Sequence, residues 1–173
     1  MLSGKDRTLV APRCFLAGTY IRTDHGEVPV ERLSVGNAAQ TFRGEMRRIV
    51  WIGSGRMLIT RGRRNAATPV IVRKDALADN VPYRDLHITK GHALYIDDVL
   101  IPVEFLVNHR SIIWDNQPRE VELYHIGLAT HDVLLANGAP AESYRDDGSD
   151  WLFQNSKSDE GCNLSSRNPV SYK

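Results

Sequence analysis

The strongest constraint on the fold is a predicted β-hairpin that begins a few residues after a cysteine, Cys14. Residues 19–23 are β-branched and alternating, which favours a strand, and His25-Gly26 provides a turn. Val28 and Val30 then begin the return strand. The thiol of Cys14 is therefore expected to lie on a fixed sheet framework.

Short segments with strand character continue along the chain at intervals of about ten residues, with turn residues between them. Asn137-Gly138 is the strongest two-residue hairpin turn, and Asp97-Asp98 is another. Gly53-Ser54-Gly55 is expected to separate two strands. Residues 102–107, which begin with proline, carry the signal of one short helix. The expected strands after the first hairpin are residues 39–42, 49–52, 57–60, 70–72, 85–89, 93–96, 99–101, 111–114, 121–128 and 133–136.

These segments predict an all-β fold of many short strands, a sandwich or a closed, barrel-like sheet, with at most one short helix. A length of 173 residues and a hydrophobic content of 42% suit one domain with its own core. The composition changes after Arg145. Residues 147–173 are polar and without apolar periodicity, so we expect them to form a flexible tail.

Charge and hydropathy argue against several classes of function. The formal net charge of +1 gives no electrostatic argument for binding nucleic acid or an anionic membrane. The arginines between Arg43 and Arg64 alternate with Gly, Met and Ile, as on the outer faces of strands. The start of the chain lacks the apolar centre of a signal peptide, and no apolar run approaches a membrane span. We expect a soluble protein with no nucleic-acid or membrane partner, whose compartment the sequence leaves open.

Polar residues suited to chemistry occur in two further stretches. Thr89 and His92 are three residues apart at the predicted end of a strand, where both side chains can point at one substrate atom. His125 and His131 lie in and directly after a later predicted strand. Cys14, Thr89 and His92 thus offer a nucleophile, a hydroxyl donor and an imidazole for proton transfer.

The motifs around Cys14, Thr89 to His92, and His131 resemble those of the Hint domain in both residues and order. This is the self-processing module of inteins and hedgehog proteins, and the chain looks most like bacterial stand-alone Hint proteins. The first motif departs from the family pattern at Asn37, where the family usually has Asp. The resemblance implies a compact Hint-type β fold over residues 14–146, preceded by residues 1–13 as a leader.

The resemblance also implies a reaction. Cys14 would attack the carbonyl carbon of Arg13, so that a thioester replaces the Arg13–Cys14 peptide bond. His92 would protonate the leaving amine, and Thr89 would donate to the tetrahedral oxyanion. Water or an external thiol would then accept the acyl group. The domain would thus be a single-turnover autoprotease acting on its own N-terminal peptide, with no cofactor and no metal.

Four residues are further candidates within the same resemblance. His131 matches the family histidine, and His125 stands where inteins often carry Asp. Ser143 falls where hedgehog-type chains carry a late cysteine, although a surface hydroxyl fits that position equally well. Asp85 is an auxiliary candidate for the acid that hedgehog proteins place upstream of the Thr-x-x-His motif.

The more elaborate reactions of the family find no support in the sequence. Protein splicing ends with a His-Asn pair, and no such pair closes this domain. Sterol transfer needs an acid before the Thr-x-x-His motif, and residues 61–72 contain none. Cys162 is expected to be an exposed tail thiol, or an acyl acceptor if the tail folds back. We expect the domain to be a monomer.

Two alternatives stay open. The chain could be a catalytically inactive Hint scaffold that serves as a binding or structural module, and the intact mass of the purified protein would distinguish this from self-cleavage. It could also be a multiple-turnover Cys-His hydrolase. That alternative requires an activated, accessible Cys14, but this residue precedes a hairpin and lacks the helix dipole that lowers a thiol pKa.

Overall fold

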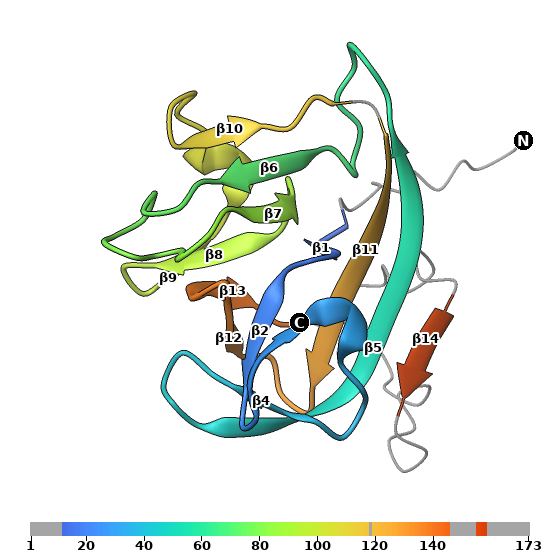
Figure 1. Ribbon diagram of the computed structural model, residues 1–173, viewed down its shortest axis with the longest axis vertical. Coiled ribbons are helices and arrows are strands. Elements are labelled where there is room, and N and C mark those ends of the chain that lie inside the picture. The colour runs from blue at the N-terminus through green and yellow to red at the C-terminus, as the bar shows by residue number, and fades with distance from the viewer. Residues whose placement is uncertain (1–11, 118, 146–154, 159–173) are drawn as a thin grey trace, which may run out of the picture.

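The computed structural model describes residues 12–117, 119–145 and 155–158, and they form an all-β fold, as the sequence predicts (Figure 1). The expected short helix is a 3₁₀ turn, η2 (Val103–Leu106), and a second 3₁₀ turn, η1 (Val30–Arg32), was not expected. No α-helix occurs in this described part of the chain. The strands are β1 (Phe15–Leu16), β2 (Tyr20–Thr23), β3 (Gly26–Pro29), β4 (Ala38–Gln40), β5 (Met46–Ile59), β6 (Pro69–Val72), β7 (Leu86–Thr89), β8 (Ala93–Ile96), β9 (Val99–Pro102), β10 (Ile112–Trp114), β11 (Arg119–Leu128), β12 (Val133–Ala136), β13 (Ala139–Glu142) and β14 (Asn155–Ser158).

Two long strands, β5 and β11, organise the sheet. They pair antiparallel from Arg119 opposite Ile59 to Leu128 opposite Ile49, and Figure 1 shows them as two long, curved strands side by side. The strand order is β10-β6-β7-β1-β11-β5-β4-β2-β12-β13-β8-β9. The short strand β1 therefore lies between β7 and β11. This order brings the residues around Cys14 next to the end of β7 and to the middle of β11.

The expected turn at Gly53-Ser54-Gly55 is wrong, because these residues lie inside the continuous strand β5. Gly53 is paired with His125, and Gly55 is paired with Leu123. Glycine weakens an isolated strand, but here a ten-residue partner supplies the hydrogen-bonding ladder on one edge. The tertiary pairing with β11 thus overrides the local preference of the two glycines.

Strand β14 covers the other edge of β5 with antiparallel pairs from Asn155 opposite Ser54 to Ser158 opposite Trp51. It belongs to the segment 147–173 that was expected to be a flexible tail. A ladder of backbone hydrogen bonds needs no apolar side chains, which explains how so polar a sequence forms a strand. The rest of that tail, and residues 1–11 of the expected leader, lie outside the described residues.

Both predicted two-residue hairpin turns are present. Asn137 and Gly138 have φ angles of 48° and 81°, and Asp97 and Asp98 have 49° and 65°. Positive φ at both central residues matches the twist of the adjoining strands, and Asn, Asp and Gly tolerate it best. These turns connect β12 to β13 and β8 to β9.

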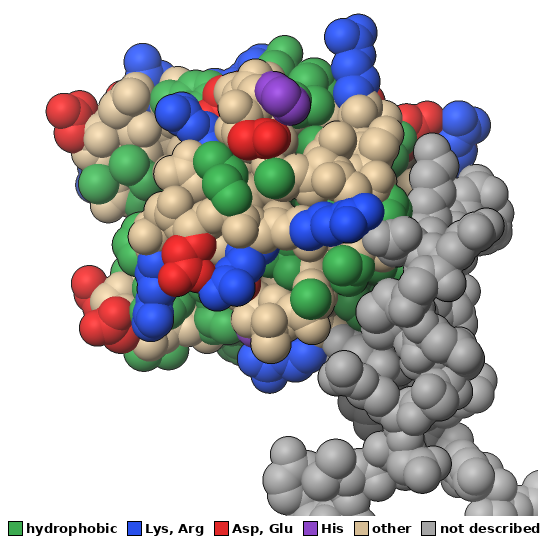
Figure 2. All heavy atoms as spheres, turned by 90° about the horizontal axis from the view of Figure 1, so that it is seen from below, with side chains coloured by type: hydrophobic (Ala, Val, Ile, Leu, Met, Phe, Trp, Pro, Cys, Tyr) green, Lys and Arg blue, Asp and Glu red, His purple; other side chains and the backbone are tan. Residues whose placement is uncertain are grey.

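The core consists of two clusters of buried apolar side chains. The larger one includes Phe15, Ile21, Ile88 and Ile126, and the smaller one contains Cys14, Leu16, Trp51, Val121 and Leu123 among others. On the face shown in Figure 2, basic and acidic side chains are interspersed. Within the described residues, no helix has the length and apolar character needed to cross a membrane.

We predict that Asn137→Ala destabilises the fold more than the matched change Asp97→Ala. Both residues have positive φ, so both variants share the backbone strain of alanine. Asn137 alone is buried, accepts a hydrogen bond from the Tyr20 amide (2.8 Å) and donates one to the Asp85 carbonyl (3.0 Å). The free energy of unfolding in urea should therefore fall by about 2 kcal/mol more for Asn137→Ala. Equal losses would show that these two hydrogen bonds contribute nothing.

Candidate active site

Thr89 fixes the chain on both sides of Arg13. The amide of Cys14 donates to the Thr89 hydroxyl (2.9 Å), and that hydroxyl donates to the Pro12 carbonyl. The Thr89 amide in turn donates to the Cys14 carbonyl (3.0 Å). Thr89 is the last residue of β7, which pairs with β1 through Phe15 opposite Ile88. The Arg13–Cys14 peptide bond is thus held by hydrogen bonds against the end of β7.

The thiol of Cys14 is enclosed by apolar side chains. Its exposed fraction is 0%, and it belongs to the cluster that contains Leu16, Trp51 and Leu123. Burial raises the pKa of Cys14 well above its ordinary value, because the thiolate is poorly solvated there. At neutral pH Cys14 is therefore a neutral thiol, which would have to lose its proton in order to act as a nucleophile.

His92 is buried in the turn between β7 and β8. Its amide donates to the Thr89 carbonyl (2.9 Å), and its ring packs on Phe15 with 4.4 Å between the ring centroids. Nε2 lies 3.1 Å from the Glu142 carbonyl oxygen, which can only accept, so Nε2 carries the proton of the neutral ring. Nδ1 is buried and has no hydrogen-bond partner among the described residues. Burial lowers the pKa of His92, which leaves Nδ1 as a free acceptor at neutral pH.

His125 lies in β11 beside His92, with 5.5 Å between the two ring centroids. The ring of Tyr144 packs perpendicular to it at 5.1 Å. Burial, and then electrostatic interaction with His92 and Arg13, lower the pKa of His125 well below its ordinary value. Two neutral imidazoles therefore lie next to each other, and that of His92 packs on Phe15 of β1.

Glu142, at the end of β13, is a site residue that sequence reasoning missed. Its carboxylate is buried, accepts from the Ala93 amide (2.9 Å), and lies 3.5 Å from Nε2 of His131 and 3.7 Å from Nη1 of Arg13. Burial acts to raise the pKa of Glu142, but the contacts with His131, His92, the Ala93 amide and Arg13 hold it below its ordinary value. The sequence feature that could have indicated Glu142 is an acidic residue at the end of an otherwise apolar strand, directly after the Asn137-Gly138 turn.

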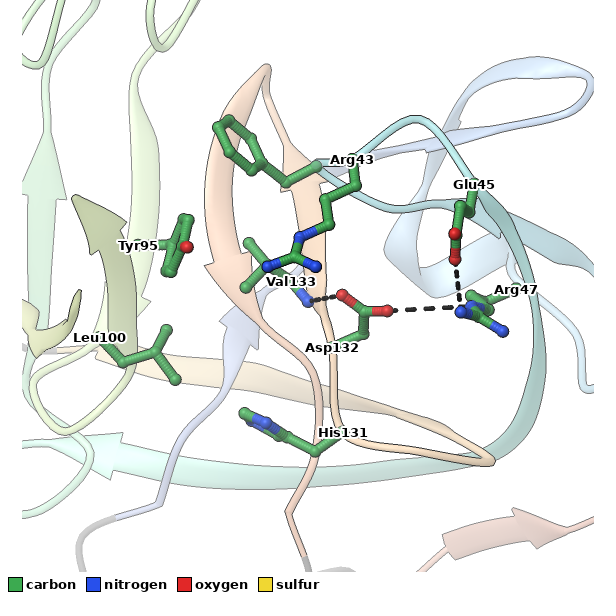
Figure 3. Close-up of a pocket in the computed structure, with 9 residues that line it drawn as sticks. Arg43, Glu45, Arg47, Tyr95, Leu100, His131, Asp132 and Val133 are labelled. Carbon is green, nitrogen blue, oxygen red and sulfur yellow. Dashed lines mark hydrogen bonds and ion pairs between the residues drawn. The ribbon is translucent and has the colours of Figure 1, made fainter. Parts of the chain in front are cut away.

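His131 connects this buried cluster to a surface pocket of about 350 Å³. Figure 3 shows His131 and Asp132 among the residues that line the pocket, with Arg47 paired with both Asp132 and Glu45. The structure thus brings Arg13, Cys14, Thr89, His92, His125 and His131 into one connected cluster with Glu142, through the contacts described above.

The two auxiliary candidates have other contacts. Ser143 is buried, and its hydroxyl accepts a hydrogen bond from the Asp132 amide (2.9 Å), which ties the end of β13 to the turn before β12. Asp85 is exposed and its carboxylate accepts from the Lys74 amide (2.9 Å). Asn37 accepts from the Ser34 amide (2.8 Å), so its departure from the family pattern concerns a local turn. Cys162 lies outside the described residues.

No group of three or more His, Cys, Asp or Glu side chains in the described part of the chain is arranged to hold a metal ion. The chemistry that the cluster offers is that of a thiol, three imidazoles and a carboxylate. Such groups can support acyl transfer, in which a thiol attacks a carbonyl and an imidazole moves the proton.

Comparison with known proteins places the chain in one family. The sequence model of the Hint domain matches residues 13–148. The fold is similar to the solution structure of a bacterial intein-like domain from Clostridium thermocellum (TM-score 0.59, 14% identity, 76% of this chain and 99% of that chain covered). It is also similar to a DnaB intein from Synechocystis sp. PCC 6803 (TM-score 0.54, 11% identity, 76% and 99% covered). No curated protein sequence matches the chain.

The two buried histidines predict a stability that falls as the pH drops from about 7 to 5. The pKa values of His92 and His125 are lowered in the folded protein, so in this range the unfolded chain binds more protons. Each histidine then removes up to about 1.4 kcal/mol per pH unit from the free energy of unfolding. The lowered pKa of Glu142 also makes the fold less stable as the pH falls, but most of this loss of stability occurs below pH 5.

Urea unfolding at pH 7, 6 and 5 measures this dependence. His125→Gln should make the slope of stability against pH shallower by removing one buried imidazole. His25→Gln is the matched control, because the His25 side chain is 83% exposed, and it should leave the slope unchanged. The same slope in both variants would contradict the assignment of His125 as a buried neutral group.

Proposed function

The chain belongs to the Hint-domain family, and from that membership we propose that it is a self-processing domain that cleaves its own Arg13–Cys14 bond through a thioester. One observation carries the proposal. Thr89 holds the residues on both sides of Arg13, directly before the buried Cys14 thiol and close to His92. This arrangement presents one particular peptide bond of the chain to one thiol.

The acyl shift is proposed to use His92 as the proton carrier. Neutral Nδ1 of His92 accepts the thiol proton while the sulfur of Cys14 bonds to the carbonyl carbon of Arg13. The C–N bond then breaks, and His92 returns the proton to the Cys14 nitrogen, which becomes a free amine. Burial of His92 favours the second transfer, since a desolvated imidazolium gives up its proton readily.

The remaining groups support this step in different ways. Thr89 keeps its hydrogen bond to the Cys14 nitrogen while the geometry at that atom changes. His125 supplies a second neutral imidazole beside His92. Every group belongs to one chain, so we propose that a monomer is sufficient and that the substrate is its own N-terminal peptide.

The thioester is less stable than the peptide bond that it replaces, so the reaction proceeds only if a later, irreversible step consumes the thioester. We propose that water or an external thiol attacks the thioester and releases the leader. Such a small nucleophile is proposed to approach from the pocket that His131 lines, since His131 contacts Glu142 of the cluster (Figure 3). No cofactor is required by this scheme.

The burial of Cys14 favours one other function, a catalytically inactive Hint scaffold that acts as a binding or structural module. A thiol with 0% exposure and a raised pKa is a weak nucleophile unless a base acts on it directly. The same burial argues against a multiple-turnover hydrolase, because an external peptide cannot reach the sulfur.

We predict that dithiothreitol or hydroxylamine releases a peptide that ends at Arg13, because both reagents intercept thioesters. Mass spectrometry after incubation at neutral pH measures the released leader and the domain that begins at Cys14. Cys14→Ala is the control and should give no release. Full-length protein alone after long incubation with either reagent would favour the inactive scaffold.

A second prediction separates the roles of two histidines. His92→Ala should slow thiol-induced release by about 10²–10⁴, the usual contribution of a general acid or base. His131→Ala should slow it less, because the described contacts connect His131 to the cluster through Glu142. Release is measured at one pH, with folding checked by circular dichroism and with His109→Asn as an exposed control. Undiminished release in His92→Ala would move the proton-carrier role to His125.

A further inference from the structure

Glu142 is a buried carboxylate whose nearest permanent cation comes from the leader. Its side chain is 3% exposed, and Oε2 lies 3.7 Å from Nη1 of Arg13. Its other contacts are the Ala93 amide and the His131 imidazole. Among the ion pairs of the described residues, Arg13 is the one arginine or lysine partner of Glu142.

Arg13 reaches this acid from the residue directly before the nucleophile. Its side chain is 29% exposed, so the guanidinium is partly removed from water. A buried carboxylate without a cationic partner is costly, and a partly buried pair is screened less than a surface pair. Glu142 therefore favours a cationic side chain at position 13 more strongly than an exposed acid would.

We propose that Glu142 determines the specificity of the site for the residue before the scissile bond, and that it selects leaders ending in a cationic side chain, arginine or lysine. This inference rests on the proposed cleavage of the Arg13–Cys14 bond. The substrate class is thus a peptide segment of the same chain whose last residue is basic.

The geometry of the pair specifies which replacements are tolerated. One guanidinium nitrogen approaches one carboxylate oxygen, so the contact does not use the two-pronged geometry that distinguishes arginine from lysine. Lysine at position 13 should therefore replace arginine with little loss. A neutral side chain leaves Glu142 without its permanent cation, and an acidic one adds repulsion in a buried position.

The first test compares leader release by dithiothreitol for Arg13, Arg13→Lys and Arg13→Gln, each with Glu142 and with Glu142→Gln. With Glu142 present, the rate of leader release should stay within about threefold of the parent for Arg13→Lys and should fall about tenfold for Arg13→Gln. A loss of about tenfold lies between the effects of breaking an exposed and a buried charge pair. With Glu142→Gln, the ratio between Arg13 and Arg13→Gln should fall close to one. Arg22→Gln, which removes an exposed arginine paired with Glu27, is the control and should leave release unchanged.

The second test measures the same pair without any cleavage. In the Cys14→Ala background, a double-mutant cycle of Arg13→Gln and Glu142→Gln in urea unfolding should show favourable coupling between the two residues. Absence of coupling overturns the inference, whatever the release assay shows. The inference is also overturned if the ratio of the release rates of Arg13 and Arg13→Gln stays the same when Glu142 is replaced by Gln. Coupling without any release in the parent chain supports the recognition of Arg13 by Glu142 but contradicts the proposed cleavage.

Discussion

The pairing of the segment around Cys14 with the end of β7 is the interaction on which the candidate site depends. Strand β1 is only two residues long, yet it is inserted between β7 and β11. Its position lets one hydroxyl, that of Thr89, accept from the Cys14 amide and donate to the Pro12 carbonyl. A peptide bond held in this way loses little entropy when it reacts, which is the advantage of an intramolecular substrate.

Burial has opposite consequences for the thiol and for the imidazoles. It raises the pKa of Cys14, which makes the resting site unreactive, and it lowers the pKa values of His92 and His125, which keeps both rings able to accept a proton. A proton transfer from sulfur to imidazole creates charge in an apolar environment. The fold thus suits a reaction that occurs once, with the substrate in place, better than repeated turnover on external peptides.

Glu142 is the carboxylate of this buried cluster, and Arg13 is its permanent cation. It is close enough to His131 and to Arg13 to affect both, and its carbonyl oxygen fixes the orientation of the His92 ring. One residue at the end of β13 therefore contacts Arg13 as well as two of the imidazoles. Under the proposed recognition of Arg13 by Glu142, cleavage would depend on the residue before Cys14 as well as on the thiol.

The sequence by itself determined the all-β class, the turns at Asp97-Asp98 and Asn137-Gly138, and the order of the motifs around Cys14, His92 and His131, because these are properties of neighbouring residues. Only the tertiary structure decided that Gly53 and Gly55 continue a strand and that Glu142 faces Arg13. The long ladder between β5 and β11 supplies hydrogen bonds that outweigh the local preference of the two glycines for a turn. Glu142 lies 129 residues after Arg13 in the chain and approaches it through the pairing of β13 with β8. Such contacts depend on strand order, which local sequence patterns do not encode.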